Sequence, residues 1–297
     1  MSISRFHEGE LAMQHRARVR AEADRLMGML APPRLDGGPA RFLGKCTFAA
    51  LTSRDGEGRL WTSPLVDPPG FLDAVATTLR IHTLPALGDP LRELHEGQAV
   101  GLIAMDFARR RRVRINGVLA ERHAEGLRVN VDQAFGNCPK YIRPRHLETD
   151  EAPSERSVEA PSAALSAAQV GLLRRTETFF LGTSHPRRGV DTSHRGGPPG
   201  FLRVEDGTVG WPDYPGNNMF TSFGNLAVDD AAAVLVPDFA GGETVQISGT
   251  AAVEWAAPGS AGDEGGTGRR VRLVVRHVVS GAMLMHERTI GPSGAPA

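Results

Sequence analysis

The sequence predicts a mainly β fold with a few helices, built as two tandem β-barrels that pack together as an internal pseudo-dimer. The first observation is a repeat: Pro68–Leu72 (PPGFL) recurs as Pro198–Leu202, 130 residues later. The second is a series of short apolar or alternating segments separated by turn residues, which is typical of small barrels. One long period with two copies indicates a duplicated domain, since a solenoid needs a shorter period and more copies.

The repeat keeps its register well beyond the first motif. Three further pairs of short motifs match at offsets of 130 or 132 residues: Thr62-Ser63 with Thr192-Ser193, Asp106-Phe107 with Asp238-Phe239, and Ile115-Asn116-Gly117 with Ile247-Ser248-Gly249. We therefore expect each copy to form one barrel. The polar clusters described below are present in the second copy and altered in the first, so the two halves have diverged in chemistry.

Composition limits the classes of function. The 297 residues suit two domains, and an apolar content of 40% is enough for two cores. No segment is long enough to cross a bilayer, and the N-terminus does not have the pattern of a signal peptide. Two cysteines fit a reducing compartment, so we expect a cytoplasmic protein without a membrane partner. Basic and acidic residues balance at 34 each, which argues against a nucleic-acid partner.

Residues 1–40 are expected to form an N-terminal helical segment. Helix-forming residues with apolar groups near helical spacing predict a helix over 6–29, which Pro32-Pro33 ends. The first barrel repeat, with a degenerate site, follows over 41–146. Its predicted strands cover 48–52, 60–63, 79–83, 99–105 and 112–119, with a short helix at 90–95.

An acidic and then Ala/Ser/Pro-rich segment, 147–165, reads as a linker or an exposed excursion. The second repeat, 166–297, should carry the functional motifs. Ser166 is expected to cap a helix over 167–176, with Glu177 too far along for a capping box. Predicted strands follow at 179–183, 200–204, 233–236, 244–248 and 271–279, and a Gly-rich hairpin tip covers 257–269.

Three polar clusters are candidate sites. The first, 189–197, places Ser193, His194 and Arg195 at a strand end, where their donors could hold an anionic or heteroaromatic ligand. The alternative is a hairpin with solvated polar groups.

The second cluster, 211–225, combines glycines and large aromatic residues with a polar set. Its candidate residues are Asn217, Asn218, Met219, Thr221, Ser222 and Asn225. Backbone amides and short polar side chains of this kind can hold a phosphate and the edge of a flat ring. The Gly/Asn density is equally typical of a turn, and the aromatics of a core.

The third cluster, 134–145, supplies local positive charge through Lys140 and Arg143 beside Tyr141. A basic surface loop is the alternative. The run Arg109–Arg112 reads as a solvated hairpin tip, and Cys138 as a bystander thiol. No HExxH or Cys/His spacing predicts a metal, and no GxGxxG or GxxxxGK[ST] motif predicts a Rossmann or P-loop nucleotide site.

These clusters resemble the pyridoxamine 5′-phosphate oxidase-like, FMN-binding split β-barrel family. The likeness is to a bacterial branch with an N-terminal FHEGE segment, here Phe6–Glu10. Asn137–Ile142, Asp191–Gly197 and Trp211–Asn225 also look like that branch. The resemblance implies an FMN held at the junction of two barrels, which the duplication could supply within one chain.

Carried onto this sequence, the resemblance implies that His194 and Arg195 flank the flavin ring as the catalytic pair. The 217–222 stretch would meet the phosphate and ribityl chain, and Gln246 the ring edge. Thr221 and Ser222 depart from the family, which has an Arg-Lys pair there. Lys140, Arg143 or Arg195 would then neutralise the phosphate, and pyridoxamine phosphate is an unlikely substrate. We expect one flavin per chain.

The expected function is an FMN-dependent oxidoreductase acting on a small organic substrate. Electrons would pass to or from a separate reductase, NAD(P)H or dioxygen, and the sequence leaves a homodimer open. One alternative is a flavin-binding carrier or sensor without turnover. Another is a split barrel that uses the deazaflavin F420 or haem, with His194 and His277 as the histidines to consider for haem.

Overall fold

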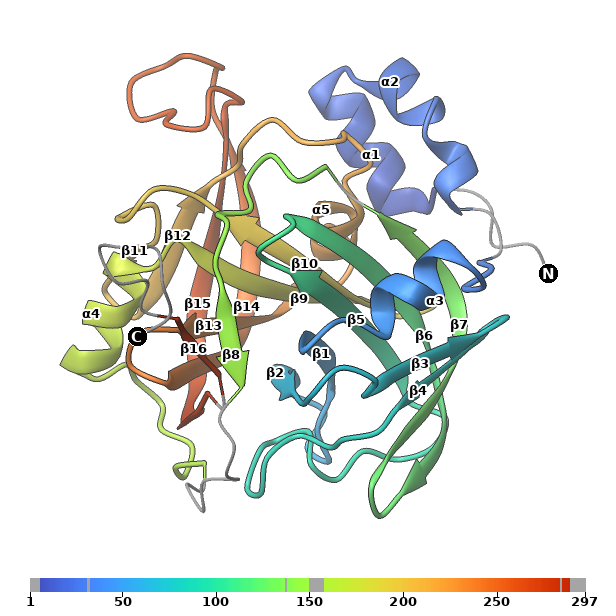
Figure 1. The fold of residues 1–297 in the computed structure, drawn as a ribbon. Coiled ribbons are helices and arrows are strands. Elements are labelled where there is room, and N and C mark those ends of the chain that lie inside the picture. The colour runs from blue at the N-terminus through green and yellow to red at the C-terminus, as the bar shows by residue number, and fades with distance from the viewer. Residues whose placement is uncertain (1–5, 31–32, 137, 150–157, 284, 289–297) are drawn as a thin grey trace, which may run out of the picture.

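The computed structural model describes residues 6–30, 33–136, 138–149, 158–283 and 285–288, and it contains two seven-stranded antiparallel sheets (Figure 1). The first sheet consists of β1 (Phe48–Arg54), β2 (Leu60–Val66), β3 (Leu72–Val75), β4 (Thr78–Ile81), β5 (Ala99–Asp106), β6 (Arg111–His123) and β7 (Gly126–Gly136). The second consists of β9 (Thr178–His185), β10 (Gly189–Gly196), β11 (Arg203–Glu205), β12 (Thr208–Pro212), β13 (Ala231–Asp238), β14 (Glu243–Trp255) and β15 (Arg269–Ala282).

The two sheets have the same topology. Their strand orders are β2-β1-β5-β6-β7-β4-β3 and β10-β9-β13-β14-β15-β12-β11, so each strand of the first has a counterpart eight numbers later. Each sheet surrounds its own buried apolar cluster. The mainly β fold with two tandem barrel repeats is therefore confirmed. The remaining strands, β8 (Leu147–Thr149) and β16 (Met285–Glu287), follow the two repeats and pair with each other.

The repeated sequence motifs form repeated local structures. In both Pro-Pro-Gly-Phe segments the Phe amide donates to the first Pro carbonyl, and Gly70 and Gly200 have φ of 102° and 87°. Glycine adopts this left-handed conformation without strain, as position i+2 of a type II turn requires. The Ile-Asn-Gly and Ile-Ser-Gly motifs both mark a register shift, between Asn116 and Gly117 and between Ser248 and Gly249. The sequence repeat therefore encodes a repeated turn and a repeated β-bulge.

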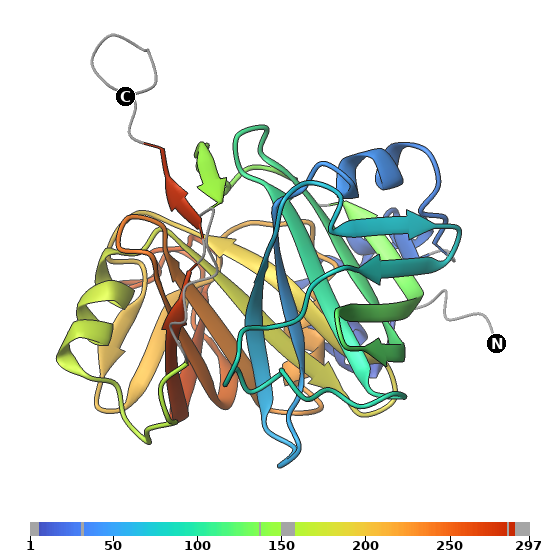
Figure 2. The same ribbon diagram turned by 60° about the horizontal axis from the view of Figure 1, so that its bottom comes forward.

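The repeats pack reciprocally, side by side in Figure 2. β10 contacts β5 and β6 of the first repeat, and β2 contacts β13 and β14 of the second. Phe107 and Phe239, which are equivalent in the repeat, meet edge to face with ring centroids 5.2 Å apart. Thr192 donates to Thr52 across the same interface at 2.6 Å. These contacts have the self-complementary form of a two-fold dimer interface, so the repeats are arranged as an internal pseudo-dimer.

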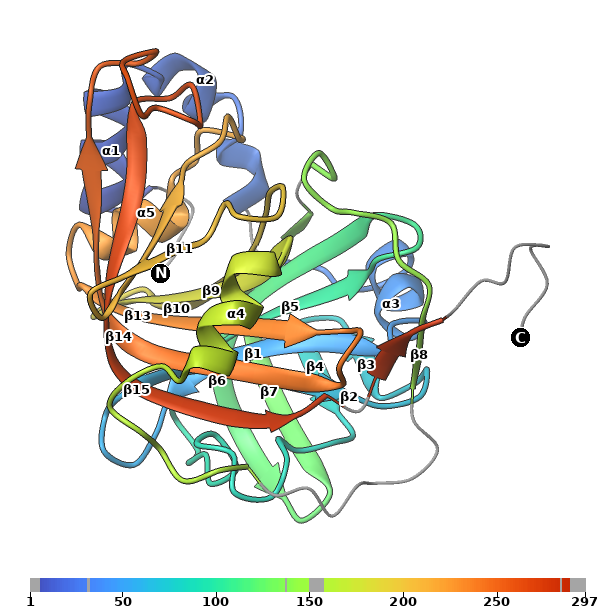
Figure 3. The same cartoon turned by 90° about the vertical axis from the view of Figure 1, so that its left-hand side faces the viewer.

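The N-terminal segment packs on the second repeat. It contains α1 (Glu8–Ala17), α2 (Arg20–Asp24) and a 3-10 turn (Met27–Leu30), and α1 lies against α5 (Thr221–Leu226) in Figure 3. The prediction of one helix over 6–29 was wrong at Arg18, whose left-handed conformation (φ 58°) ends α1. Pro32 lies outside the described residues.

Several other predictions need correction. A helix that the sequence reading did not anticipate, α3 (Gly38–Leu43), precedes the first strand, and residues 90–95 form turns instead of a helix. The predicted linker begins with β8, and backbone bonds tie Glu159 and Ser162 to β15. Ser166 does cap α4 (Ala167–Arg175), but Gln169 completes a capping box that had been excluded. Residues 257–268 form the expected tip between β14 and β15.

No helix in the described residues has the length and apolar character to span a membrane.

Candidate functional site

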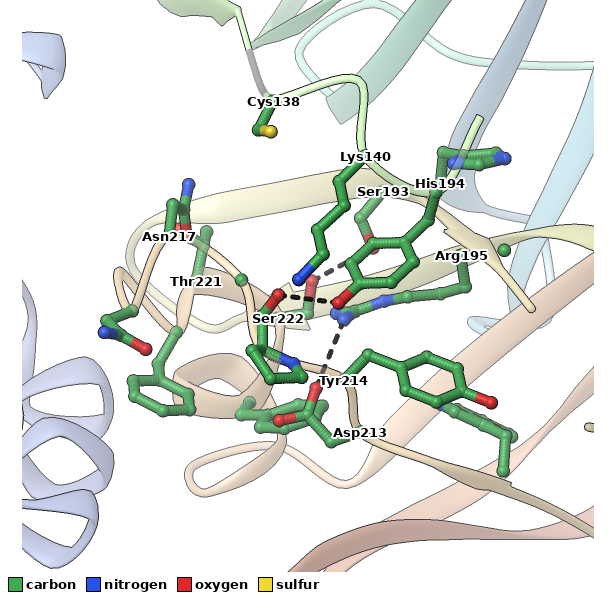
Figure 4. Close-up of a pocket in the computed structure, with 18 of the residues that line it drawn as sticks. Cys138, Lys140, Ser193, His194, Arg195, Asp213, Tyr214, Asn217, Thr221 and Ser222 are labelled. Atoms are coloured by element: carbon green, nitrogen blue, oxygen red, sulfur yellow. Dashed lines mark hydrogen bonds and ion pairs between the residues drawn. The ribbon is translucent and has the colours of Figure 1, made fainter. Parts of the chain in front are cut away.

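A cavity of about 360 Å³ lies where the two repeats meet (Figure 4). The first repeat contributes Arg112 and Arg114 from β6 and the loop that follows β7. The second contributes the end of β10, the loop after β12, and α5. The residues that line it include Arg112, Arg114, Lys140, Tyr141, Ser193, His194, Arg195, Asp213, Tyr214, Asn217, Asn218, Phe220, Thr221, Ser222, Phe223 and Arg269.

The three predicted clusters meet around this cavity. Of the predicted site residues, Lys140, Tyr141, Ser193, His194, Arg195, Asn217, Asn218, Thr221 and Ser222 line it. In Figure 4 the side chains of Lys140 and Arg195 extend toward the middle of the cavity, whereas the His194 ring turns away from it. The structure thus gathers three separate segments that lie between residues 134 and 225 of the chain.

Four predicted residues lie outside the lining. Met219 is buried in a small core with Phe6 and Leu30 of the N-terminal segment. Asn225 bonds instead to the His7 ring and to Thr183. These two side chains therefore hold the N-terminal segment and the barrel together behind the site.

Gln246 and Arg143 were also placed wrongly. The Gln246 amide donates to Ser63 and Asp89 of the first repeat, 3.0 Å from each, and does not reach the cavity. Arg143 is exposed and pairs with Glu177 at 2.6 Å. Its charge is therefore neutralised by a carboxylate that does not line the cavity.

The cavity is rich in cations that lack an acidic partner. Arg114 is paired with the buried Asp191, and Arg269 with Asp213. In the described part of the chain, neither Arg112 nor Lys140 has a carboxylate within ion-pair distance, while Arg195 comes no nearer than 3.8 Å to one. Burial and the neighbouring Arg114 and Arg195 lower the pKa of Arg112 to about 10. Cations such as Arg112 and Lys140, which have no carboxylate partner among the described residues, favour an anionic ligand.

Arg112 and Arg114 were missed by sequence reasoning. Arg112 belongs to the arginine run read as a hairpin tip, and its three predecessors are indeed exposed. The alternation along β6 turns Arg114 inward, where it is 8% exposed. The sequence repeat could have identified Arg114 as a candidate. Arg114 aligns with Gln246, so the same strand position carries a polar group in both copies.

A buried hydrogen-bond network forms the base of the cavity. The Ser222 hydroxyl lies 3.1 Å from the Ser193 hydroxyl and 3.3 Å from Asp191. Asp191 also accepts from both Arg114 and Asn116 of the first repeat. Asp191 thereby joins the two repeats, and both serines line the cavity.

His194 is held as a neutral ring. Its Nδ1 accepts from the Arg112 guanidinium at 2.9 Å, and its Nε2 lies 3.5 Å from the Thr178 hydroxyl. Because an arginine can only donate, the proton of His194 must be on Nε2. Burial, together with Arg112 and Arg195, lowers the pKa of His194 well below its ordinary value. His194 therefore positions Arg112 and does not offer a proton to the cavity.

The loop after β7 crosses to the second repeat and closes one side of the cavity. The Tyr141 ring stacks on Tyr214 with centroids 5.4 Å apart, and its hydroxyl donates to the Pro215 carbonyl at 2.9 Å. A Cβ at Gly196 would lie 2.1 Å from the Tyr141 carbonyl oxygen. Glycine at 196 thus permits the approach that places Lys140 over the cavity.

On the other side, Asn218 and Phe220 have positive φ of 60° and 62°. A bulky residue in this region costs about 1–3 kcal/mol, and such strain is concentrated at binding sites. The Arg269 guanidinium lies over the Phe220 ring, 5.0 Å from its centroid. The strained turn therefore presents an aromatic face next to the cavity.

The equivalent position in the first repeat is filled. Ser63, the counterpart of Ser193, donates to Asp89 at 2.6 Å. Gln246, the counterpart of Arg114, donates to the other Asp89 oxygen at 3.0 Å. Asp89 is 5% exposed, and burial raises its pKa. In the first repeat one carboxyl group thus bridges both positions, whereas in the second Ser222 contacts Ser193 and Asp191 contacts Arg114.

One group of side chains has the composition of a metal site, contrary to the expectation from sequence spacing. The ligand atoms of His7, Glu8 and His185 lie within 4.8 Å of one another, away from the cavity. However, His7 accepts from Gly9 through Nδ1 and lies 3.1 Å from Asn225 through Nε2. Both of its ring nitrogens are engaged, so His7 has no lone pair free for an ion.

Comparison with known proteins found likeness in structure only. The chain matches no protein-family model and no curated protein. Among solved structures it is similar to a proposed pyridoxamine 5′-phosphate oxidase of Lactobacillus delbrueckii, with 18% identity and a TM-score of 0.31 over 39% of this chain and 93% of that one.

It is also similar to the FAD binding protein of Mycobacterium smegmatis, with 14% identity and a TM-score of 0.29 over 42% and 99% of the two chains. HupZ of Group A Streptococcus matches with 11% identity and a TM-score of 0.31, over 38% and 91%. Each match therefore spans about two fifths of this chain and nearly all of the other protein.

Proposed function

We propose that this protein is an FMN-dependent oxidoreductase that holds one FMN in the cavity between its repeats and acts on a small organic substrate. The observation that carries the proposal is the set of three cations, Arg112, Lys140 and Arg195, gathered from both repeats without a hydrogen-bonded carboxylate. A phosphate group on a flat, partly polar molecule suits such a set together with the aromatic walls.

The residues fit the cofactor at both ends. The Nε atoms of Arg112 and Arg195 are buried without a hydrogen-bond partner, which is costly unless a ligand supplies one. Arg112, Lys140 and the Ser193 and Ser222 hydroxyls would hold the phosphate. Tyr214, Phe220 and Phe223 would bound the ring. Arg112 thereby takes the role that the sequence had assigned to Arg143.

Bound FMN would supply hydride transfer, and the protein would position the substrate and exclude water. The missing Arg-Lys pair at Thr221 and Ser222 makes pyridoxamine phosphate a poor candidate substrate. We propose a cytoplasmic protein whose electron partner is a separate reductase, NAD(P)H or dioxygen. A homodimer would be compatible with the internal pseudo-dimer.

The haem alternative loses support at its ligands. His194 directs its lone pair to Arg112, and His277 lies outside the cavity lining, 6.5 Å from the Trp61 ring centroid. F420 shares the flavin ring outline and a phosphate, so it is best separated from FMN by direct titration.

The test is the visible spectrum of the purified protein, followed by titration with FMN, riboflavin, F420 and haem. We expect about one FMN per chain, and affinity for FMN at least about 100-fold above that for riboflavin, because two or more charged hydrogen bonds reach the phosphate. A protein that is colourless and takes up no FMN would overturn the proposal. Anaerobic bleaching of the bound flavin by candidate substrates would then distinguish an enzyme from a carrier or sensor.

A further inference from the structure

Arg195 and Asp213 face each other in the cavity without forming a hydrogen bond. The Arg195 Nη1 and the Asp213 Oδ1 are 3.8 Å apart, joined by a dashed line in Figure 4. Asp213 is 7% exposed, and the Arg195 side chain is 27% exposed. The two side chains thus lie within ion-pair distance without a hydrogen bond between them.

Each partner keeps hydrogen-bonding capacity toward the cavity. Asp213 Oδ2 accepts from the Arg269 Nε at 2.8 Å, whereas its Oδ1 faces only Arg195. Within the described residues Arg195 donates no hydrogen bond, and its Nε is buried without a partner. Its guanidinium lies over the Phe223 ring, 5.3 Å from the centroid. The pair therefore presents one acceptor and one donor, side by side.

Arg269 fixes the acceptor in place. It bonds Asp213 and lies between two rings, with its Cζ 5.0 Å from the Phe220 centroid and 5.6 Å from that of Trp255. Burial raises the pKa of Asp213, while Arg195 and Arg269 act in the opposite direction. Asp213 thus has one oxygen committed to Arg269 and the other directed at Arg195 in the cavity.

We propose that Arg195 and Asp213 together recognise a ligand edge in which an N–H stands next to a C=O. The carbonyl accepts from Arg195, and the N–H donates to Asp213 Oδ1. This inference rests on the proposed FMN site, where the pyrimidine edge of the ring has this arrangement and haem has none. Asp213 is then a cofactor-binding residue that sequence reasoning missed, and it sets the direction in which the ring enters.

The ligand can be altered while the protein is left intact. FMN carrying a methyl group on N3 lacks the N–H, and 8-demethyl-FMN is changed only at the far end of the ring. The full chain should bind 3-methyl-FMN roughly 10- to 100-fold more weakly than FMN, the range for a lost hydrogen bond to a charged group. It should bind 8-demethyl-FMN nearly as well as FMN.

The same titrations on Asp213→Ala complete a double-mutant cycle. In this variant FMN and 3-methyl-FMN should bind alike, while Asp230→Ala, an exposed control outside the cavity, should discriminate as the unaltered chain does.

An alkaline titration of bound FMN separates charge from steric fit. Asp213 should raise the pKa of the flavin N3–H, and Asp213→Asn should lower it again.

The outcomes separate the two proposals. FMN that binds with no discrimination against 3-methyl-FMN would overturn the recognition pair and leave the flavin site standing. Discrimination that persists in Asp213→Ala would assign it to another residue, and also overturn the pair. If FMN itself does not bind, the proposed function fails before the recognition pair is reached.

Discussion

Glu10 is a buried carboxyl group at the start of α1. It is 4% exposed, and its Oε2 accepts from the His7 amide at 2.9 Å in a capping box. Burial, against the opposing effect of the His7 hydrogen bond, raises the pKa of Glu10 from 4.5 to about 7. The folded protein therefore retains a proton that the unfolded chain releases, so Glu10 makes folding less favourable as the pH rises from about 4.5 to about 7.

Replacing Glu10 with Gln should remove this pH dependence. The stabilising effect of protonated Glu10 is complete below about pH 4.5 and is lost as the pH rises through 7, a change of about 3 kcal/mol. Glu10→Gln should match the unaltered chain near pH 4.5 and exceed its free energy of unfolding by up to about 3 kcal/mol at pH 8. Denaturant titrations at both pH values measure this. If the free energy of unfolding changes with pH in the same way in both proteins, this prediction is contradicted. His7, whose pKa falls to about 4, is common to both proteins and cancels.

Arg112 should distinguish phosphate binding from ring binding. Arg112→Ala removes a cavity cation without a carboxylate partner, so FMN should bind roughly 10- to 100-fold more weakly. Riboflavin, which has no phosphate, should be affected much less. Arg143→Ala is the matched control, because Arg143 is paired with Glu177 outside the cavity. Fluorescence titration with both flavins measures the four affinities. An equal loss for FMN and riboflavin would remove Arg112 from the phosphate site.

At the scale of single residues, sequence reasoning located segments better than atoms. The glycine-rich polar clusters predicted from the sequence include Ser193, Lys140 and Ser222, and all three residues line one cavity. Sequence reasoning could not distinguish the role of Arg112 from that of Arg143, because both are arginines near a turn. The difference is which one meets a carboxylate, and Glu177 is 34 residues from Arg143 in the chain.

At the scale of elements, α1 docks on α5 through two glycines. A Cβ at Gly9 would lie 2.0 Å from the Gly224 carbonyl oxygen, and one at Gly224 would lie 2.5 Å from the Glu10 amide nitrogen. Gln14 adds a hydrogen bond to the Met219 carbonyl at 3.0 Å. Because Thr221 and Ser222 begin α5, this helix contact supports the wall of the cavity.

Gly9→Ala should therefore weaken both stability and the site. The added methyl group meets backbone atoms that cannot rotate away, so we expect a loss of about 1–3 kcal/mol or more. FMN affinity should fall with it, as α5 shifts. Gly28→Ala is the control, since a Cβ there meets nothing within 4 Å. Thermal unfolding with and without FMN measures both effects. A variant as stable as Gly28→Ala would exclude the close helix contact.

The elements that sequence reasoning recovered are those with a local signal. Repeated Pro-Pro-Gly and Ile-x-Gly motifs correspond to a turn and a β-bulge whose geometry needs glycine or proline. The left-handed break at Arg18 and the turns at 90–95 have no such signal. Their conformations are set by tertiary contacts, such as the Arg92 side chain donating to the Pro85 carbonyl.

At the scale of the whole molecule, duplication explains why one site is open. The two repeats share strand order and interface, yet their equivalent positions at the junction differ. Thr52 and Gly182 are equivalent, and a Cβ at Gly182 would lie 2.4 Å from the Thr52 methyl carbon. The interface has therefore lost strict two-fold symmetry, and one half can close its cavity while the other keeps it.

Asp89 should behave as a built-in carboxyl group that fills the closed half. Its carboxyl group accepts from Ser63, Gln246 and the Leu91 amide. Asp89→Ala leaves these donors buried and unpaired, so we expect a loss of about 2–4 kcal/mol. Formate, a carboxylate small enough for the vacated space, should restore part of the melting temperature of this variant.

The melting temperature should be compared in formate and in chloride at equal ionic strength. A difference between the two salts then reports binding in the space that the Asp89 side chain vacated. Leu91→Ala is the control, because Leu91 is buried and the change removes no carboxyl group. Formate should raise the melting temperature of Asp89→Ala more than that of Leu91→Ala or the unaltered chain. Equal shifts in all three would mean that the first repeat is closed by packing alone. Selective rescue would show that the closed half holds a carboxyl group supplied by its own chain, and would account for one flavin per chain in a molecule with two repeats.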